Sequence, residues 1–231
     1  MAQELNHQSC TNCVYRTWAF NKLSQDELKL IDNHKKEFAY NKGEVILQEG
    51  DEISSFLYLR KGLVKLLSTE KNEKEHIISI AKPMDFVGLL SIFSNQKQLY
   101  TITAIEQSVV CFVELDVIKN LIKENGEFAL DFLEKISKVS DDVIHTRMKI
   151  NTKQLRGRIA YILLFFANHI YKKNAFELPV SRKEIAQLID MSTENVIRIL
   201  SEFRKDNILS IEGKNITIHD SERLQRIYNL G

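Results

Sequence analysis

Two side chains of opposite charge, Glu194 and Arg198, stand four residues apart behind Ser192, a residue typical of helix N-caps. The apolar residues of this segment recur at helical spacing and predict one buried face: Val196, Ile199, Leu200 and Phe203. Glu194 and Arg198 are then expected on the outward face. There an arginine can donate two hydrogen bonds to a guanine, and a glutamate can accept from a cytosine amine while it orients the arginine. The alternative is a solvated ion pair, which is the usual role of such a pair.

The segment before Ser192 predicts a second, shorter helix. Ser181 and Glu184 form a capping box, and Asp190 and Met191 form a tight turn between the two helices. Two helices joined in this way are the helix-turn-helix pattern. Two short strands follow around residues 212–215, Glu-Gly-Lys-Asn, and predict a hairpin that acts as a wing. The residues expected to contact DNA, at bases or phosphates, are Ser181, Arg182, Ser192, Thr193, Glu194, Asn195, Arg198 and Lys214.

The chain has three cysteines, Cys10, Cys13 and Cys111. A disulfide framework is not expected, because a reducing compartment keeps so few cysteines as thiols. The Cys10-x-x-Cys13 spacing and Cys111 are candidate metal ligands. The alternative for Cys111, which stands in the apolar run SVVCFVELD, is an ordinary buried strand thiol.

Short β-type runs punctuated by glycine predict a small antiparallel roll, and the capping box Ser24 to Glu27 predicts a helix that introduces it. The expected strands lie within residues 43–67, 76–80, 100–105 and 108–114. With a short helix over 116–125, a long helix and the C-terminal helix-turn-helix, the fold class is α+β.

The long helix, from Glu127 to about Lys153, has no internal proline or glycine. Its apolar residues repeat every 3.5 positions, as in a coiled-coil seam that two copies of the chain could bury between them. The expected dimer interface is Ala129, Phe132, Ile136, Val139, Val143 and Ile150, with Thr146 in the same repeat. The alternative is that this stripe packs on its own domain.

Residues 1–150 carry 19 Lys and Arg against 22 Asp and Glu, whereas residues 151–231 carry 13 against 9, so only the second part favours a polyanion. No apolar run approaches the about 18 residues of a membrane span, and the first residues lack a signal-peptide pattern. We therefore expect a cytoplasmic protein with no membrane partner. The sequence shows no nucleophile elbow, phosphate loop or HExxH motif, so we do not expect an enzyme. A small-molecule-binding barrel without a DNA role is the alternative from another class.

The segment SRKEIAQLIDMSTENVIRILSEFRKDNIL, residues 181–209, resembles the DNA-binding motif of the cyclic-AMP-receptor/FNR (Crp/Fnr) superfamily. The resemblance extends to the sensor domain and to the helix after the hinge through Gly43, Gly50-Asp51, Tyr58, Gly62, Val64-Lys65 and Gly157-Arg158-Ile159-Ala160. It implies an N-terminal arm (1–20), a cyclic-nucleotide-binding-like β-roll of the jelly-roll type (21–126), a dimerisation helix (127–153) and a winged helix-turn-helix (154–231). It also implies a homodimer on palindromic double-stranded DNA, with RNA polymerase as a further partner.

Within this resemblance, cyclic AMP is not expected as a ligand, because the residues that bind it in the family are absent here. Members that bind cyclic nucleotides have Gly-Glu for the ribose and, about ten residues later, Arg followed by Ser or Thr for the phosphate. Here Gly88 is followed by Leu89, and Gln98-Leu99-Tyr100 occupy the arginine region. Burying a phosphate without a cation costs several kcal/mol. Lys97 is a conceivable substitute.

Oxygen sensors of the same family hold an iron–sulfur cluster with N-terminal cysteines and one cysteine late in the roll, which Cys10, Cys13 and Cys111 resemble. A [4Fe–4S] cluster normally takes four thiolates. The additional N-terminal cysteine is absent, with Thr17-Trp18-Ala19 nearby, so an Asp or His would have to be the fourth ligand. Haem held by His76 or His145 is a third alternative, and the effector stays open.

Overall fold

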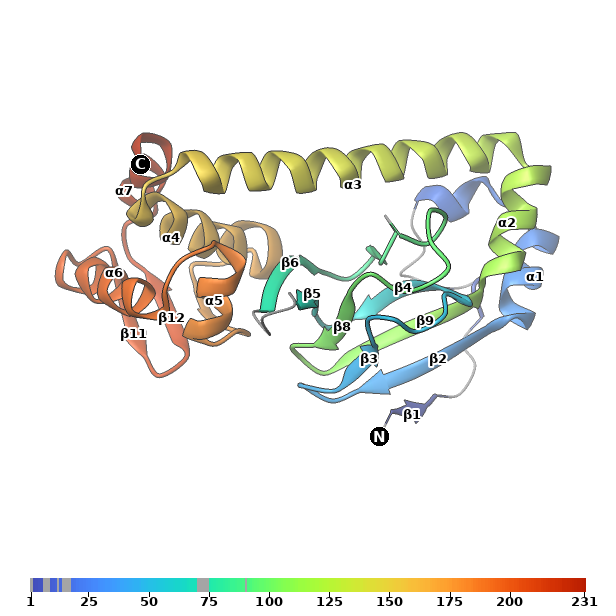
Figure 1. The fold of residues 1–231 in the computed structure, drawn as a ribbon, viewed down its shortest axis with the longest axis horizontal. Helices are drawn as coiled ribbons and strands as arrows, with labels where there is room; N and C mark the ends of the chain where they lie inside the picture. Colours follow the sequence, from blue (N-terminus) through green and yellow to red (C-terminus); the bar gives the residue numbers. More distant parts are fainter. Residues whose placement is uncertain (1, 6–8, 12, 14–17, 70–74, 90) are drawn as a thin grey trace. The chain divides into compact units, whose positions relative to one another are not determined.

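The structure, a computed structural model, describes residues 2–5, 9–11, 13, 18–69, 75–89 and 91–231 (Figure 1). The chain divides into two compact units, residues 1–74 with 78–143 and residues 75–77 with 144–231. The predicted α+β class, with a roll, a long helix and a winged helix-turn-helix, is confirmed. No helix among the described residues is both long and apolar enough to span a bilayer.

The N-terminal part consists of strands and short helices that lead into one long helix. In chain order these are β1 (Gln3–Glu4), η1 (Trp18–Lys22), α1 (Gln25–Asn33), β2 (Lys35–Tyr40), β3 (Val45–Leu47), β4 (Ser55–Lys61), β5 (Val64–Thr69), β6 (Glu75–Ala81), β7 (Phe86–Val87), β8 (Thr101–Ala104), β9 (Ser108–Glu114), α2 (Leu115–Glu124) and α3 (Gly126–Thr152). The Ser24 to Glu27 capping box begins α1 as predicted.

The strands form two antiparallel sheets, one in the order β1-β2-β9-β4-β7 and the other in the order β3-β8-β5-β6. Successive residues of a strand point to opposite faces of its sheet. One face of the five-stranded sheet therefore packs on the other sheet, and its second face lies under helices. The core between the sheets contains Tyr40, Ile46, Leu57, Leu59, Val64, Leu66, Ala81, Val87, Ile102, Ala104 and Val110.

The second face of the five-stranded sheet carries Phe56, Tyr58, Cys111 and Val113, which pack against apolar residues of α1, α2 and the start of α3. Aromatic rings dominate this contact, with the Phe56 and Phe132 ring centroids 5.6 Å apart. Because both faces of β4 and β9 are covered, the two strands read as almost continuous apolar runs. The Phe132 side chain is only 2% exposed.

This packing favours the alternative for α3, in which part of the predicted seam packs on its own domain. Phe132 and Ile150 are buried within the chain, and Ile136 and Val139 are packed against the core of the roll. The large apolar side chains that solvent reaches on α3 are Leu130, Leu133, Ile144 and Met148. At about 100° per residue, these four fall within roughly 60° of one another, and their centre lies roughly 120° around the helix from the centre of the predicted seam. The stripe read from the sequence is thus mainly the helix's inward face.

The C-terminal part begins with α4 (Leu155–Leu164), which continues as a π-helical segment, η2 (Phe165–Tyr171). The remaining elements are β10 (Ala175–Glu177), α5 (Arg182–Leu188), α6 (Thr193–Lys205), β11 (Leu209–Glu212), β12 (Asn215–Ile218) and α7 (Ser221–Leu230). The predicted wing is confirmed as the β11–β12 hairpin, and β10 adds a third strand on β12. The sequence pattern did not predict β1, β2, β7, β10 or α7.

Gly62 ends β4 in a left-handed conformation, with φ +84°, and a Cβ atom there would lie 2.4 Å from Gln107 O and Ser108 Oγ. We expect Gly62→Ala to lower the free energy of unfolding by about 3 kcal/mol or more, through strain and overlap together. Gly43→Ala is the matched control, because Gly43 has φ +89° but nothing within 4 Å of the new Cβ. That variant should lose only about 1–2 kcal/mol. Urea denaturation followed by circular dichroism measures both, and equal midpoints would contradict the expectation.

Candidate functional site

The helix-turn-helix is built from two capped helices, as predicted. Ser181 Oγ accepts from the Glu184 amide, and Glu184 Oε2 accepts from the Ser181 amide at 2.7 Å, so the capping box that begins α5 is complete. Asp190 adopts φ +51° in the turn, and Ser192 Oγ accepts from the Asn195 amide at the start of α6. Both helix starts are thus set by local hydrogen bonds that the sequence encodes.

Arg158 on α4 holds this turn in place. Its guanidinium donates to Ile189 O at 3.3 Å and Asp190 O at 2.9 Å, and its Nε donates to Lys153 O at 3.0 Å. A guanidinium offers five donors in a rigid fork, which suits several carbonyl groups at once. The sequence predicted no role for Arg158 beyond its part in the resemblance.

The outward face of α6 presents Glu194, Ile197 and Arg198, of which Ile197 is 52% exposed. Thr193 and Asn195 are half-buried beside them. The face therefore offers an arginine, an amide, a hydroxyl, a carboxylate and an apolar side chain to a partner.

The predicted pairing of Glu194 with Arg198 is wrong in this structure. Arg198 donates to Glu202 Oε1, four residues towards the C-terminus, and to Asn195 Oδ1 at 3.2 Å. Hydrogen bonds from its own backbone amide and from the Ser192 hydroxyl lower the pKa of Glu194. A carboxylate in the first turn is drawn to free amide groups there, and Glu202 is equally near to Arg198 on the helix.

Glu202 also links α6 to α4. Arg156 donates to Glu202 Oε2 at 2.7 Å and to Asp206 Oδ2 at 2.9 Å, and its guanidinium stacks over the Phe203 ring. The spacing of Arg198 and Glu202 could have indicated their pairing from the sequence. The Arg156 contacts span 46 and 50 residues, so only the fold brings them together.

The wing places Lys214 at an exposed hairpin tip, next to Gly213 with φ +62°. Arg182 Nη2 donates to Gly213 O at 3.3 Å, which ties the start of α5 to the wing. Burial lowers the pKa of Arg182, which nevertheless stays charged at neutral pH because its normal value is so high. Ser181 is exposed at the same end of α5.

In the roll, Leu89 lies where cyclic-nucleotide-binding relatives have a glutamate. It is 3% exposed and belongs to the aromatic core under the helices. Gln98 is also buried, and its backbone pairs with Gly50 and Asp51. Lys97 is exposed, and its backbone forms an isolated antiparallel β-bridge with Glu52. These positions offer apolar and amide groups where a phosphate and a ribose would need a cation and a carboxylate.

The structure brings the cysteines to the same side of the five-stranded sheet. Cys111 on β9 lies opposite Glu37 on β2 and Tyr58 on β4, and Cys10 packs against the same core. Cys13 shares a turn with Cys10, with Cys13 N donating to Cys10 O at 3.3 Å. Burial, the largest cause in each case, raises the pKa of both Cys10 and Cys111 to about 12.

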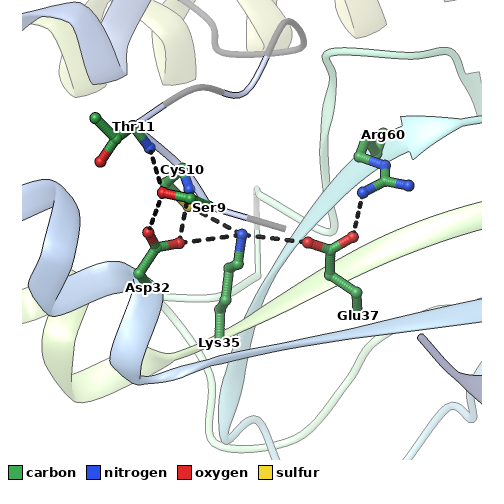
Figure 2. A network of polar contacts seen from close by, with 7 residues as sticks. All are labelled: Ser9, Cys10, Thr11, Asp32, Lys35, Glu37 and Arg60. Atoms are coloured by element: carbon green, nitrogen blue, oxygen red, sulfur yellow. Dashed lines mark hydrogen bonds and ion pairs between the residues drawn. The ribbon is translucent and has the colours of Figure 1, made fainter. Parts of the chain in front are cut away.

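These residues do not fit a four-thiolate iron–sulfur cluster. The chain has three cysteines, and Cys10 Sγ already accepts a hydrogen bond from Lys35 Nζ at 3.2 Å (Figure 2). Metal ligation requires the thiolate, whereas burial favours the neutral thiol. Within the described ranges, no three His, Cys, Asp or Glu side chains are grouped as metal ligands. Thr17 lies outside the described residues. Of the haem candidates, His76 is half-buried on β6 and His145 is exposed on α3.

Comparison with known proteins agrees with this architecture. Residues 37–125 match the family described as a cyclic nucleotide-binding domain, and residues 157–227 match the Crp-like helix-turn-helix domain. The fumarate and nitrate reduction regulatory protein of Yersinia pestis is 28% identical over 210 residues, 89% of this chain and 84% of that protein. Regulatory protein HlyX of Actinobacillus pleuropneumoniae is 25% identical over 221 residues, 93% of this chain and 92% of that protein.

Two solved structures share the fold at 21% identity each. FixK2 of Bradyrhizobium japonicum superposes with a TM-score of 0.76, covering 84% of this chain and 96% of that one. A putative Crp/Fnr regulator of Eubacterium rectale superposes with a TM-score of 0.75, covering 93% and 99%. A sensor-type roll, a long helix and a winged helix-turn-helix define a DNA-binding transcription regulator. The chain belongs to the Crp/Fnr family of such regulators, and its relatives there are regulators and not enzymes.

Arg158→Met tests how the helix-turn-helix is held. The variant keeps the length of the side chain but loses the donors to Lys153, Ile189 and Asp190, so we expect it to lower the free energy of unfolding by about 2 kcal/mol. Thermal denaturation measures the change. Arg226→Met, at an exposed position on α7, is the control and should shift stability by less than about 0.5 kcal/mol. Equal melting temperatures for the two variants would show that Arg158 does not hold the turn.

Proposed function

We propose that this protein is a homodimeric, sequence-specific regulator that binds palindromic double-stranded DNA through α6 and receives its signal in the β-roll. The observation that carries the proposal is the outward face of α6, which is exposed, begins at a capped turn and presents Arg198 beside Asn195. The first turns of a recognition helix are the part that enters the major groove.

We assign the DNA contacts to two groups. Arg198, Asn195, Glu194 and Thr193 are assigned to base edges, because arginine pairs with guanine O6 and N7 and asparagine pairs with adenine. Ser181, Arg182, Ser192 and Lys214 are assigned to phosphates, since they lie at helix starts or on the wing. Glu202 orients Arg198 before DNA binds, so the guanidinium is held on the outward face.

The dimer is assigned to the exposed apolar stripe of α3, formed by Leu130, Leu133, Ile144 and Met148. Side chains of this size that are 56–68% exposed on one face of a helix lose unfavourable hydration when a second copy covers them. Ala129 and Val143 of the predicted seam are half-buried, so they contribute less.

The signal is assigned to something other than a cyclic nucleotide. The buried Leu89 and Gln98 support this, because neither can balance a cyclic phosphate charge in the roll. Because its DNA partner is there, we place the protein in the cytoplasm. RNA polymerase is its further partner under this proposal.

Binding to DNA tests the proposal directly. Selection from random duplexes by the full-length protein should yield a palindromic site. The centres of its two half-sites should lie about 34 Å apart, one helical turn. We expect Arg198→Ala to weaken binding by about 1–3 kcal/mol and to lose preference at one base pair per half-site. Lys214→Ala is the matched control and should weaken every duplex alike while it lowers the salt slope. Unchanged base preference in Arg198→Ala would remove Arg198 from base recognition.

A charge within the exposed stripe tests the dimer. Leu130→Asp combined with Leu133→Asp should shift the protein from dimer to monomer in sedimentation at micromolar concentration, because a buried unpaired carboxylate costs several kcal/mol. Lys149→Asp, at an exposed position of α3 outside the stripe, should leave the dimer intact. If the double variant stays dimeric, the interface lies on another surface.

A further inference from the structure

A short segment of the N-terminal arm, Ser9–Thr11, is fastened to the end of α1 by one carboxylate. Asp32 Oδ1 accepts from the Cys10 amide at 2.7 Å, and Asp32 Oδ2 accepts from the Ser9 hydroxyl at 2.8 Å (Figure 2). The Thr11 amide in turn donates to Ser9 Oγ at 3.2 Å. The Asp32 side chain is 9% exposed, so these bonds form away from bulk water.

Lys35, the first residue of β2, supplies the cation at the centre of this cluster. Its Nζ lies 3.2 Å from each of three acceptors: Cys10 Sγ, Asp32 Oδ1 and Glu37 Oε1. An ammonium has three donors and no acceptor, so three acceptors satisfy it. The Lys35 side chain is 3% exposed. Lysine is almost never buried to this extent unless it is paired.

The Cys10 sulfur shares Lys35 with two carboxylates. Asp32 and Glu37 both face the ammonium of Lys35, and Glu37 also contacts the guanidinium of Arg60. A thiolate would add a third negative group to the acceptors of Lys35, which is costly in a buried site.

We propose that Lys35 is an internal cation that holds the Cys10 segment on the roll and takes the place of a metal ion. The ammonium occupies the position from which a cation could reach the Cys10 sulfur and both carboxylates. A metal would have to displace Lys35 and remove the Cys10 proton. The Ser9–Thr11 segment is therefore held through this cluster, without metal. The inference is independent of the DNA-binding proposal.

The experiment measures how fast iodoacetamide alkylates each cysteine of the full-length protein at pH 8, by peptide mass spectrometry. Cys10 should react much more slowly in the native protein than in guanidinium. Lys35→Met removes the cation and should accelerate Cys10 alkylation by about tenfold or more, as expected when a local closed state is lost. Lys36→Met is the matched control, because Lys36 is the exposed neighbour on β2, and it should leave the rate unchanged.

The alkylation rate of Cys111 shows whether the roll stays folded, because Cys111 is buried within β9.

Asp32→Asn is the second variant. It keeps the volume of the side chain while it removes the charge that binds both the segment and Lys35, so it should also accelerate Cys10 but not Cys111. If neither variant accelerates Cys10 relative to the wild-type protein, or if Cys111 accelerates equally, the proposal is wrong.

Metal analysis completes the test. Protein purified without oxygen should hold iron and zinc well below one atom per chain, and added Zn²⁺ should not slow Cys10 alkylation. One equivalent of metal whose removal by a chelator exposes Cys10 would overturn the proposal. Protection of Cys10 by added Zn²⁺ in the wild-type protein would do the same.

Discussion

The five-stranded sheet of the roll is covered on both faces, and this constraint explains much of the N-terminal unit. One face packs on the second sheet and the other packs under α1, α2 and the first turns of α3. On β2, Lys35 and Glu37 flank the exposed Lys36, so both lie on the buried face of the strand. Lys35 and Glu37 on β2 are therefore paired with each other, and Arg60 on β4 pairs with Glu37.

The same constraint decides which side of α3 is available to a partner. Phe132 belongs to the aromatic cluster on the covered sheet, so its face of the helix is occupied. Leu130 and Leu133 are left in solvent. A repeat of apolar residues at 3.5 spacing predicts that a helix has a buried face. It does not say whether that face meets its own domain or a second chain, because both remove the same surface from water.

In the C-terminal unit, the helix-turn-helix is held both by contacts between residues close in sequence and by contacts between residues distant in sequence. Ser181, Glu184 and Ser192 cap the helices with hydrogen bonds that span three residues, and the sequence predicts them. Arg158 and Arg156 reach the turn and α6 from another helix, across 31 to 50 residues. Arg198 illustrates the difference. Its outward position follows from helical spacing, whereas its partner is Glu202 and not Glu194, because free amides in the first turn engage Glu194.

The sequence by itself determined the α+β class, most strands of the roll, the capping boxes, the wing and the two-helix motif with its outward Arg198, because propensities, turns and caps act within a few residues. It did not predict β2, which begins with the charged run Lys35-Lys36-Glu37; two of these residues are buried and contact Asp32, Cys10 and Arg60. Only the tertiary structure decided the inward face of α3, the partners of Arg198 and the environment of Cys10. Each depends on groups distant in sequence, whose contact is set by packing and by the need to pair every buried charge.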